Sequence, residues 1–403
     1  MNTMYQGQQG FFEYYRPEVN GSEEKVFRVS AAEEKDPMKM LPQGPKREST
    51  YQHQSYVWTD LDEEEAERLV INGGSLLVLG VAGTGKSYFV SKLRESLKNL
   101  GKSVDAISKT HCASERIGGV TADHYVRRHV LHGICTADAI WIDEISQLEH
   151  SLWCELNKLK KQFLLSGDFN QFGPIFDSHR GTEIPKDAFE KSRFLHLMAG
   201  GNRLILTECR RSETQLFNFY SSLIHGGSRW FTPLAEVLQK AKEQFHFSGS
   251  ARHNLVISHI KRVKINRELN NYSRPEVARY VPQKAEKGQL CKAQSLWIWA
   301  GLELLGCSQA SKKGIRNNVI YVVQSWDEEQ VVVQRKGKEE QITLTYPQMS
   351  LLRLSYAQTY ASCQGTEFDE PLRLHDTENK NFTKKHLFVA LSRAKRSDMI
   401  DLV

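Results

Sequence analysis

The chain has 403 residues and a formal net charge of +6, with 40% hydrophobic and 25% charged residues. This length allows two or three domains with proper cores, and the composition is that of a soluble globular protein. No apolar run approaches the ~20 residues that a membrane span needs, and no secretory signal is evident. The seven cysteines never form C-x-x-C. This argues for a reducing compartment and against a disulfide framework or a structural zinc site.

The N-terminal part of the chain shows a change of character near residue 55. Residues 1–55 are polar and charged, contain several prolines and lack periodic apolar positions, which predicts a poorly ordered tail or adaptor segment. The following run LDEEEAERLVI is typical of an amphipathic helix. We expect Asp60 to cap this helix and the pair Gly73-Gly74 to end it.

The stretch after this helix combines a buried strand, a glycine-rich loop and a second helix. Residues 76–79 are apolar, and residues 89–100 repeat apolar positions at helical spacing up to a glycine at 101. The loop between them reads G-x-x-x-x-G-K-S, whose backbone N–H groups can surround phosphate oxygens at a helix N-terminus. Lys86 can reach the β- and γ-phosphates, and the Ser87 hydroxyl can ligate magnesium. The predicted phosphate-binding residues are Gly80, Val81, Ala82, Gly83, Thr84, Gly85, Lys86 and Ser87.

Further strands alternate with helical stretches up to about residue 200. Such alternation predicts a parallel α/β sheet, in which ligands bind at the carboxyl ends of the strands. Polar residues follow several of these predicted strands. The strands are expected at residues 103–107, 139–142 and 162–165.

The pattern restarts in the second half, so we predict domains at 56–200 and 201–403. Residues 310–350 contain short alternating runs separated by charged turns, which indicates a small antiparallel β insertion. Ser212 and Gln215 have the spacing of a capping box for a helix. The other strands are expected at residues 203–207, 254–258, 295–299, 352–357 and 387–391.

Three polar residues at the predicted strand ends suit nucleotide hydrolysis. Asp143 and Glu144 follow a hydrophobic strand, where Asp143 would hold magnesium and Glu144 would act as the general base on the attacking water. Gln171 lies in the next strand-end loop, GDFNQFGP, and its amide can contact both the γ-phosphate and that water. An acidic pair at a strand end is a weak signal alone, but the phosphate loop upstream favours the functional interpretation.

Charge that develops on a γ-phosphate also requires cations. Candidates are Arg210-Arg211 and Arg393, although no spacing rule singles them out. Basic runs at residues 127–129, 259–264 and 384–386 could contact nucleic-acid phosphates, but each by itself is more typical of solvated surface.

Taken together, these motifs resemble those of superfamily 1 helicases, in particular the RecD- and Dda-like branch. The resemblance covers about residues 60–403. It rests on the ordered blocks GVAGTGKS, SKTHCAS, GGVTADHY, WIDEIS, GDFNQFGP, LTECRRS, YAQTYASCQGTEFD and VALSRA.

The resemblance implies two RecA-like domains with ATP and Mg²⁺ in the cleft between them and single-stranded nucleic acid across both. It implies that Arg211 and Arg393 are the arginines of the fourth and sixth motifs, which reach the γ-phosphate. It also implies that the β insertion corresponds to a small Src-homology-3-like barrel. Gln364 and Gly365 would belong to the fifth motif, with Gly365 near the nucleotide, and Thr110, His124, Thr359 and Gln364 would contact the strand.

The chain departs from the family pattern at three places. Glu64 or Glu65 lies near the position of the usual adenine-reading glutamine. Ala361 and Ser362 replace the usual histidine and lysine of the fifth motif. The stretch before WIDEIS is short, so a strand-separating pin would have to be small.

The resulting functional hypothesis is an ATP-driven DNA helicase that moves 5′ to 3′ along single-stranded DNA. Two alternatives stay open: a viral-type RNA helicase of the same superfamily, and a nucleotide-binding scaffold that does not unwind. We expect an intracellular protein, cytoplasmic or nuclear, with no membrane partner. A virus or a mobile element as its source is compatible with so compact a helicase.

Overall fold

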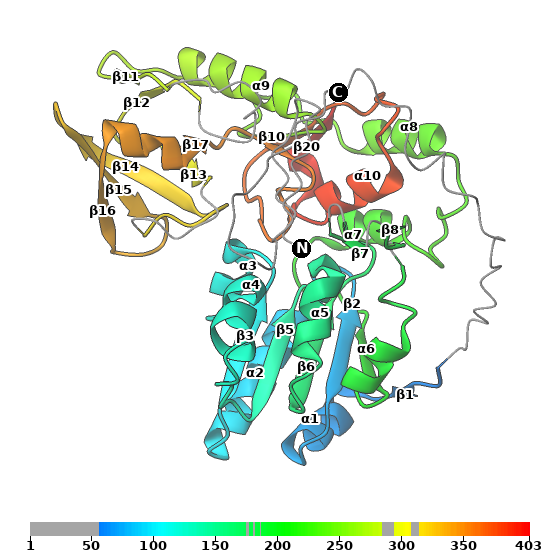
Figure 1. Cartoon of the computed structure of the whole chain (residues 1–403). Helices are drawn as coiled ribbons and strands as arrows, with labels where there is room; N and C mark the ends of the chain where they lie inside the picture. The colour runs from blue at the N-terminus through cyan, green and yellow to red at the C-terminus, as the bar shows by residue number, and fades with distance from the viewer. Residues whose placement is uncertain (1–55, 175–176, 180–181, 186, 284–293, 308–313) are drawn as a thin grey trace, which may run out of the picture. The chain divides into compact units, whose positions relative to one another are not determined.

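The computed structural model covers both predicted domains (Figure 1). No helix among the residues that it describes is long and apolar enough to cross a membrane. The predicted N-terminal segment, residues 1–55, lies outside the described residues. The structure describes residues 56–403 except 175–176, 180–181, 186, 284–293 and 308–313.

The first half of the chain folds around a seven-stranded sheet in which every neighbouring pair is parallel. The strand order is β1-β9-β2-β6-β5-β3-β4, so the strand before the phosphate loop lies near the centre. The middle residues of the central strands are apolar because helices cover both faces of the sheet. The strands are β1 (Thr59–Asp60), β2 (Leu76–Gly80), β3 (Val104–Ser108), β4 (Val120–Thr121), β5 (Ala139–Asp143), β6 (Gln162–Gly167) and β9 (Asn202–Leu206).

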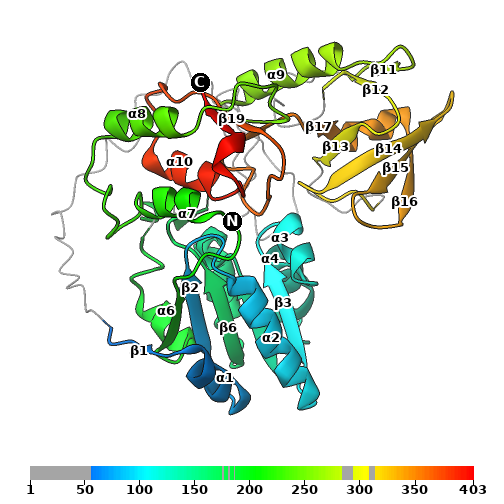
Figure 2. The ribbon, with the colours of Figure 1, turned by 180° about the vertical axis from the view of Figure 1, so that it is seen from behind.

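Two apolar cores form on the opposite faces of this sheet. One core joins α1 and α2 to the strands, and the other joins the helices between residues 122 and 199 to them. Figures 1 and 2 show α5 and α2 on opposite faces. The helices are α1 (Glu63–Ile71), α2 (Lys86–Asn99), α3 (His111–Arg116), α4 (Ala122–Tyr125), the π-helix η2 (Val126–Val130), the 3₁₀ helix η3 (Ile145–Gln147), α5 (His150–Leu156) and α6 (Arg193–Met198), and a short hairpin pairs β7 (Ser178–His179) with β8 (Thr182–Glu183).

The start of α1 differs from the prediction. Asp62, not Asp60, is the N-cap: its carboxylate accepts from the Glu65 N–H at 2.8 Å, and Glu65 accepts from the Asp62 N–H in return. Asp60 belongs to β1, where it forms a two-point ion pair with Arg203 of β9. The prediction failed because both aspartates precede the acidic run, and only tertiary pairing with β9 removes Asp60 from the helix.

The second half contains a four-stranded sheet, again with parallel neighbours only. Helices α7, α8 and α10 share one large core with its strands. Its strands are β18 (Ala357–Thr359), β10 (His253–Val256), β19 (Leu372–Leu374) and β20 (Ile400–Leu402), and its helices are α7 (Thr214–Ser221), α8 (Leu234–Gln244), α9 (His259–Tyr272), α10 (Lys384–Leu391) and the 3₁₀ helix η6 (Ser397–Met399).

Three predictions for this half were wrong. The strand near residue 203 is β9, which pairs with β2 in the first sheet and so does not begin the second domain. Helix α7 is preceded by Glu213 as its N-cap and has no side-chain cap, because the Ser212 hydroxyl donates to the Ala394 carbonyl instead. Residues 387–391 lie in helix α10, not in a strand, and all five are buried.

Helix α9 contacts strand backbone through buried asparagines. The Asn266 side chain bonds both the N–H and the carbonyl of Ala357 in the edge strand β18. The Asn270 side chain bonds both backbone groups of Trp297. These amides satisfy strand edges that would otherwise carry unpaired polar groups.

An antiparallel β region interrupts the second half, as predicted. It forms a sheet with order β16-β15-β14-β13-β17 over its own apolar core. The strand expected at 352–357 divides into β17 of this sheet and β18 of the parallel sheet. Closure of the insertion into a barrel stays a prediction. The elements are β11 (Arg279–Val281) paired with β12 (Leu296–Ile298), and β13 (Glu303–Gly306), β14 (Ile320–Trp326), β15 (Gln330–Arg335), β16 (Gln341–Thr345), the 3₁₀ helix η5 (Tyr346–Leu351) and β17 (Leu352–Leu354). Two parallel α/β sheets in tandem, with an antiparallel insertion, confirm the predicted fold class.

Candidate active site

The glycine-rich loop runs from the end of β2 to the start of α2. Gly83 and Gly85 have φ values of 94° and 89°, in the left-handed region that favours glycine. The Thr84 hydroxyl donates to the Val81 carbonyl at 2.9 Å and closes the turn. A Cβ on Gly83 would lie 3.1 Å from Arg211 Cβ. The loop is therefore compact, and its glycines serve both conformation and close packing.

Lys86 is the first residue of α2, and its side chain folds back over the loop. Its Nζ donates to the Gly80 carbonyl at 2.8 Å and to the Val81 carbonyl at 3.2 Å. Burial lowers the pKa of Lys86, although nearby carboxylates, Asp168 first among them, act in the opposite direction. The ammonium group is thus held at the mouth of the phosphate loop.

Asp143 is anchored in a chain of side-chain hydrogen bonds at the end of β5. Its Oδ2 accepts from the Ser87 hydroxyl at 3.1 Å, and its Oδ1 accepts from the Ser166 hydroxyl at 2.6 Å. Trp141 Nε1 in turn donates to the Ser166 hydroxyl oxygen at 2.8 Å. Burial and the neighbouring Glu144 raise the pKa of Asp143. Ser166, which we did not predict, is recognisable only as a small polar residue at the end of the next strand.

Glu144 follows Asp143 in an unusual conformation. Its φ and ψ are 53° and 47°, a left-handed backbone that non-glycine residues adopt rarely and that recurs at functional sites. Its Oε2 is buried without a hydrogen-bond partner, whereas Oε1 accepts from Arg116 at 3.3 Å. Burial alone would raise the pKa of Glu144, but Arg116, Arg393 and Lys86 together hold it below its usual value.

The loop after β6 is hydrogen-bonded to the phosphate loop. Asp168 Oδ2 accepts from the Ala82 N–H at 3.2 Å, and its Oδ1 accepts from the backbone and side chain of Asn170. Gln171 is 2% exposed, and its Oε1 has no hydrogen-bond partner. Asp168 was overlooked as a site residue although it lies in the motif that supplied Gln171.

The two predicted arginines lie after β9 and after α10. Arg393 is 1% exposed, its Nε and Nη2 have no hydrogen-bond partner, and its charge lowers the pKa of Lys86 and Glu144. Arg211 donates to the Ser392 carbonyl at 3.2 Å and pairs with Glu367 at 2.6 Å. Burial and Arg393 lower the pKa of Arg211. The phosphate loop, the acidic pair and both arginines therefore belong to one electrostatic environment.

Tyr220 and Arg116 also reach this environment, and sequence reasoning missed both. The Tyr220 hydroxyl of α7 donates to the Ala82 carbonyl at 3.0 Å. Arg116 of α3 contacts Asp143 and Glu144 at 3.4 and 3.3 Å. Tyr220 has no motif around it. Arg116 lies just after the block that contains Thr110. A charged residue at that place, next to apolar residues, could have indicated a site residue.

The residues predicted to contact a nucleic-acid strand occupy different environments. Thr110 is the N-cap of α3, and His124 is exposed on α4. Thr359 is buried, and its hydroxyl donates to Ser362 at 3.0 Å. Gln364 Nε2 donates to the Phe172 carbonyl at 3.2 Å, which joins the fifth block to the Gln171 loop.

Gly365, predicted to lie near the nucleotide, contacts α3 in this structure. The Cys112 thiol donates to the Gly365 carbonyl at 3.6 Å. Gly365 has φ 82°, so the turn that carries this carbonyl also depends on a left-handed glycine.

The donor set of the acidic pair fits a magnesium ion. A serine hydroxyl and a carboxylate lie 3.1 Å apart in Ser87 and Asp143, and the unpartnered Glu144 Oε2 is adjacent in sequence. Oxygen ligands of this kind, completed by water and phosphate, are those that Mg²⁺ prefers. With Lys86 and two arginines around it, the arrangement can bind a phosphate chain and activate a water molecule against it.

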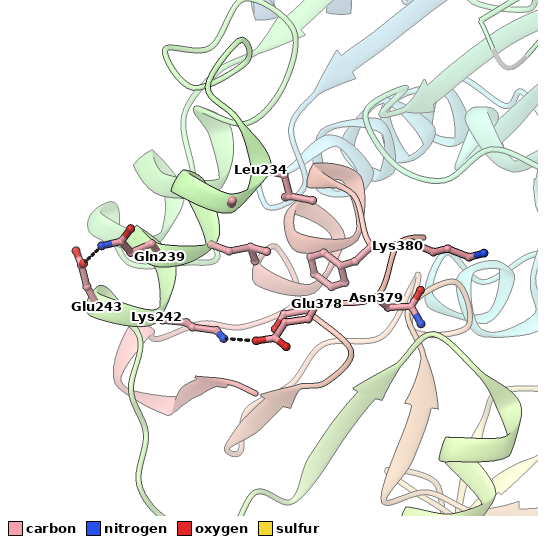
Figure 3. A pocket seen from close by; sticks show the side chains of 11 residues that line it. Leu234, Gln239, Lys242, Glu243, Glu378, Asn379 and Lys380 are labelled. Atoms are coloured by element: carbon pink, nitrogen blue, oxygen red, sulfur yellow. Dashed lines mark hydrogen bonds and ion pairs between the residues drawn. The ribbon is translucent and has the colours of Figure 1, made fainter.

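A separate groove of about 670 Å³ lies between α8 and residues 377–382 (Figure 3). Lys242 and Glu378 form an ion pair at 3.9 Å across it, and Gln239 donates to Glu243 on its α8 side. The residues that line it include none of those predicted for the phosphate site. The groove is therefore distinct from the site around Lys86.

Two protein-family models match the chain. Residues 63–183 match an AAA domain, and residues 302–400 match a viral superfamily 1 RNA helicase core domain. The first match includes the phosphate loop and the acidic pair, and the second includes Gln364 and Arg393.

Among characterised proteins, the chain is similar to ATP-dependent DNA helicases named Pif1. The human protein is 29% identical over 161 residues, which cover 32% of this chain and 24% of the human protein. The Campylobacter jejuni protein is 21% identical over 289 residues, or 63% of each chain. The matched parts thus span about a quarter of the human and rat relatives.

Solved structures of Pif1 helicases share this fold. A structure of two coordinating Pif1 helicases at forked double-stranded DNA matches with a TM-score of 0.65, covering 84% of this chain and 91% of that one, at 17% identity. A Bacteroides Pif1 bound to single-stranded DNA matches over the same shares of the two chains with a TM-score of 0.63, at 18% identity.

Proposed function

We propose that this chain, which belongs to the superfamily 1 helicases of the Pif1- and RecD-like branch, hydrolyses ATP to move along single-stranded DNA and separate duplexes. We propose movement from 5′ to 3′. The observation that carries the proposal is that distant parts of the chain meet at the phosphate loop: Ser87 bonds Asp143 beside Glu144, and Gly83 packs against Arg211, which bonds Ser392 beside Arg393.

In this proposal the loop residues 80–87 hold the ATP phosphates through backbone N–H groups and Lys86. Ser87 and Asp143 would hold Mg²⁺, which when bound neutralises phosphate charge. Glu144 orients and deprotonates the attacking water, because its Oε2 is buried, unpartnered and kept ionised by nearby cations. Gln171 positions the same water through its unpartnered Oε1.

The two arginines supply positive charge from residues beyond the phosphate-loop sheet. Arg393 is buried with free N–H groups, and charge developing on the γ-phosphate would give those groups a partner. Arg211 is held by Glu367 and the Ser392 carbonyl, so it is positioned before nucleotide arrives. Since these groups follow the first sheet in the chain, their engagement would couple hydrolysis to domain movement. We propose two domains within residues 56–403, divided after β9 (Asn202–Leu206) rather than at residue 200, because β9 pairs with β2 of the first sheet.

The proposed strand path uses Thr110, His124, Thr359 and Gln364. Gln364 is bonded to the Gln171 loop, which offers a direct connection from a strand-contacting block to the hydrolytic water. Affinity for the strand would come mainly from phosphates, so it should fall with salt and show little sequence preference. We propose that the protein acts in a reducing, intracellular compartment, because its scattered cysteines never form C-x-x-C.

RNA unwinding is a second candidate, favoured by one observation. Residues 302–400 match the core domain of viral superfamily 1 RNA helicases. The DNA proposal takes precedence because the curated relatives are DNA helicases and one of them matches 63% of the chain, more than the second half alone.

A strand-displacement assay tests the proposal. Duplexes with a 5′ tail, a 3′ tail or an RNA tail are incubated with ATP and wild type, Lys86→Ala or Glu144→Gln. We expect displacement only from the 5′-tailed DNA and only by wild type. Displacement from RNA-tailed duplexes alone would replace the DNA proposal with the RNA one. Hydrolysis without displacement on any substrate would favour a nucleotide-driven scaffold, and equal displacement by Lys86→Ala would reject the proposal.

A further inference from the structure

The six residues of α3 contact three parts of the molecule that are distant in sequence. Cys112 bonds the Gly365 carbonyl at 3.6 Å. Glu115 forms ion pairs with two arginines of the β insertion, Arg316 at 2.5 Å and Arg335. Arg116, the next residue, reaches the acidic pair at the end of β5. Adjacent side chains thus connect the β insertion to the hydrolytic centre.

The position of Arg116 conflicts with the proposed magnesium site. Its Nη2 lies 3.4 Å from Asp143 Oδ2, the same oxygen that accepts the Ser87 hydroxyl. A metal ion bound by Ser87 and Asp143 would need this oxygen. Two cations cannot approach it equally, because their like charges repel at such a distance. With 32% of its side-chain surface exposed, Arg116 has a route away from the pair.

The Glu115 ion pairs hold α3 against the β insertion. Glu115 is 17% exposed and Arg335 is 13% exposed, so this contact is shielded from solvent more than most surface pairs. The same C-terminal end of α3 is also held by Arg94, whose Nη1 donates to the Ile117 carbonyl at 2.8 Å. A displacement of the insertion would pull on Glu115, and the adjacent Arg116 would move with it.

We propose that α3 is a link between the β insertion and the acidic pair, in which Arg116 is a positioning residue that restrains Asp143 and Glu144 until magnesium and nucleotide replace it. Glu115 sets the strength of that restraint through Arg316 and Arg335. The inference rests on the proposed function, since it concerns how that site is prepared and released.

The first test measures magnesium-dependent binding of a fluorescent ADP analogue without nucleic acid. In Arg116→Ala the acidic pair loses its competing cation, so the magnesium concentration for half-maximal binding should fall about tenfold. Arg116→Lys keeps the charge and should stay near the wild-type value. Arg193→Ala removes an exposed arginine at the start of α6 and is the matched control.

Thermal unfolding gives an independent readout. Without magnesium, Arg116→Ala should melt below wild type because two buried carboxylates have lost a cation, and magnesium with ADP should restore more of the melting temperature than in wild type. If Arg116→Ala does not fold, Arg116→Gln keeps most of the side-chain length and repeats both measurements.

A double-mutant cycle tests the link itself. Glu115→Gln releases the insertion and should also lower the half-maximal magnesium concentration, but not in an Arg116→Ala background. An equal effect of Glu115→Gln in both backgrounds, or an unchanged magnesium requirement in Arg116→Ala, would overturn the inference. Even if the inference is overturned in this way, the proposed nucleotide site stands as long as wild type binds the analogue and Lys86→Ala does not. If wild type fails to bind any nucleotide, both proposals fall.

Discussion

The two sides of the candidate site differ in how their polar groups are satisfied. On the first sheet, Asp143 accepts from two serine hydroxyls and Asp168 accepts from the phosphate-loop backbone. On the other side, Arg393 is buried with two guanidinium nitrogens that have no hydrogen-bond partner. Buried N–H groups without hydrogen-bond partners are costly, so they persist where function requires them. The first sheet is prepared in advance, whereas Arg393 awaits a partner that a nucleotide would supply.

Unpartnered atoms on the first sheet fit the same interpretation. Only Glu144 Oε2 and Gln171 Oε1 are unsatisfied among the residues of that sheet to which we assign a direct role in hydrolysis. Both belong to side chains that the proposal directs at the attacking water. Within this site, hydrogen-bonded groups such as Asp168 and Ser166 build the scaffold, whereas the unsatisfied atoms of Glu144, Gln171 and Arg393 face the reaction.

The largest expected effect is on the Arg393 side. Arg393→Ala should lower the strand-stimulated ATPase rate about 10³-fold, because a positioned arginine stabilises charge on the transferred phosphate. Its melting temperature should not fall below that of wild type by more than Arg193→Ala does, since two buried guanidinium nitrogens without hydrogen-bond partners are removed with the side chain. A full ATPase rate in Arg393→Ala, or severe unfolding, would remove the contrast between the two sides.

The second effect concerns the scaffold network. Ser166→Ala leaves Trp141 Nε1 and Asp143 Oδ1 without partners, so the free energy of unfolding should fall by about 2–3 kcal/mol in urea titrations. Adding Trp141→Phe should cost less than the sum of the single changes, because the indole N–H is then no longer orphaned. If the two changes lowered the free energy of unfolding in a strictly additive way, Ser166 and Trp141 would not belong to one hydrogen-bond network.

A pH-dependent effect is expected away from the site, at His253 in β10. Burial lowers the pKa of His253 to about 4. The unfolded chain therefore binds this proton first as the pH falls below 6.5, and stability is lost between that value and 4. Between pH 7 and pH 5, protonation of His253 should lower the free energy of unfolding of wild type by about 2 kcal/mol. The His253→Phe variant should lack this part of the pH dependence. Exposed His246→Phe is the control, and an unchanged pH slope in His253→Phe would refute the assignment.

The smallest effects distinguish two neighbouring aspartates. Asp62→Ala removes the α1 cap and should cost about 1 kcal/mol. Asp60→Ala removes an exposed ion pair with Arg203 and should cost about 0.5 kcal/mol, less in high salt. Chemical unfolding at two salt concentrations measures both, and a larger loss in Asp60→Ala would reverse our assignment of the cap.

Local patterns predicted much of the first sheet. The strands before Gly80 and Asp143 are short apolar runs with polar ends, and both their parallel pairing and the position of their ends follow from alternation with helices. The sequence order of motifs, rather than any periodicity, indicated that Arg211 and Arg393 belong to the same site.

Other features depend on contacts that no local pattern encodes. Residues 387–391 are apolar on every side and fully buried, so periodicity could not separate helix from strand. The pairing of β9 with β2 is a matter of sheet order, which propensity does not determine. Tyr220, Arg116 and Asn266 act through partners 27 to 138 positions away, where only the folded chain brings them together.

The most direct test compares wild type with Arg393→Ala in ATP-dependent displacement of a strand from a 5′-tailed DNA duplex. Our account predicts that wild type separates the strands, while Arg393→Ala binds nucleotide and single-stranded DNA but leaves the duplex intact. Equal displacement by the two proteins, or none by wild type on any tailed duplex, would contradict it.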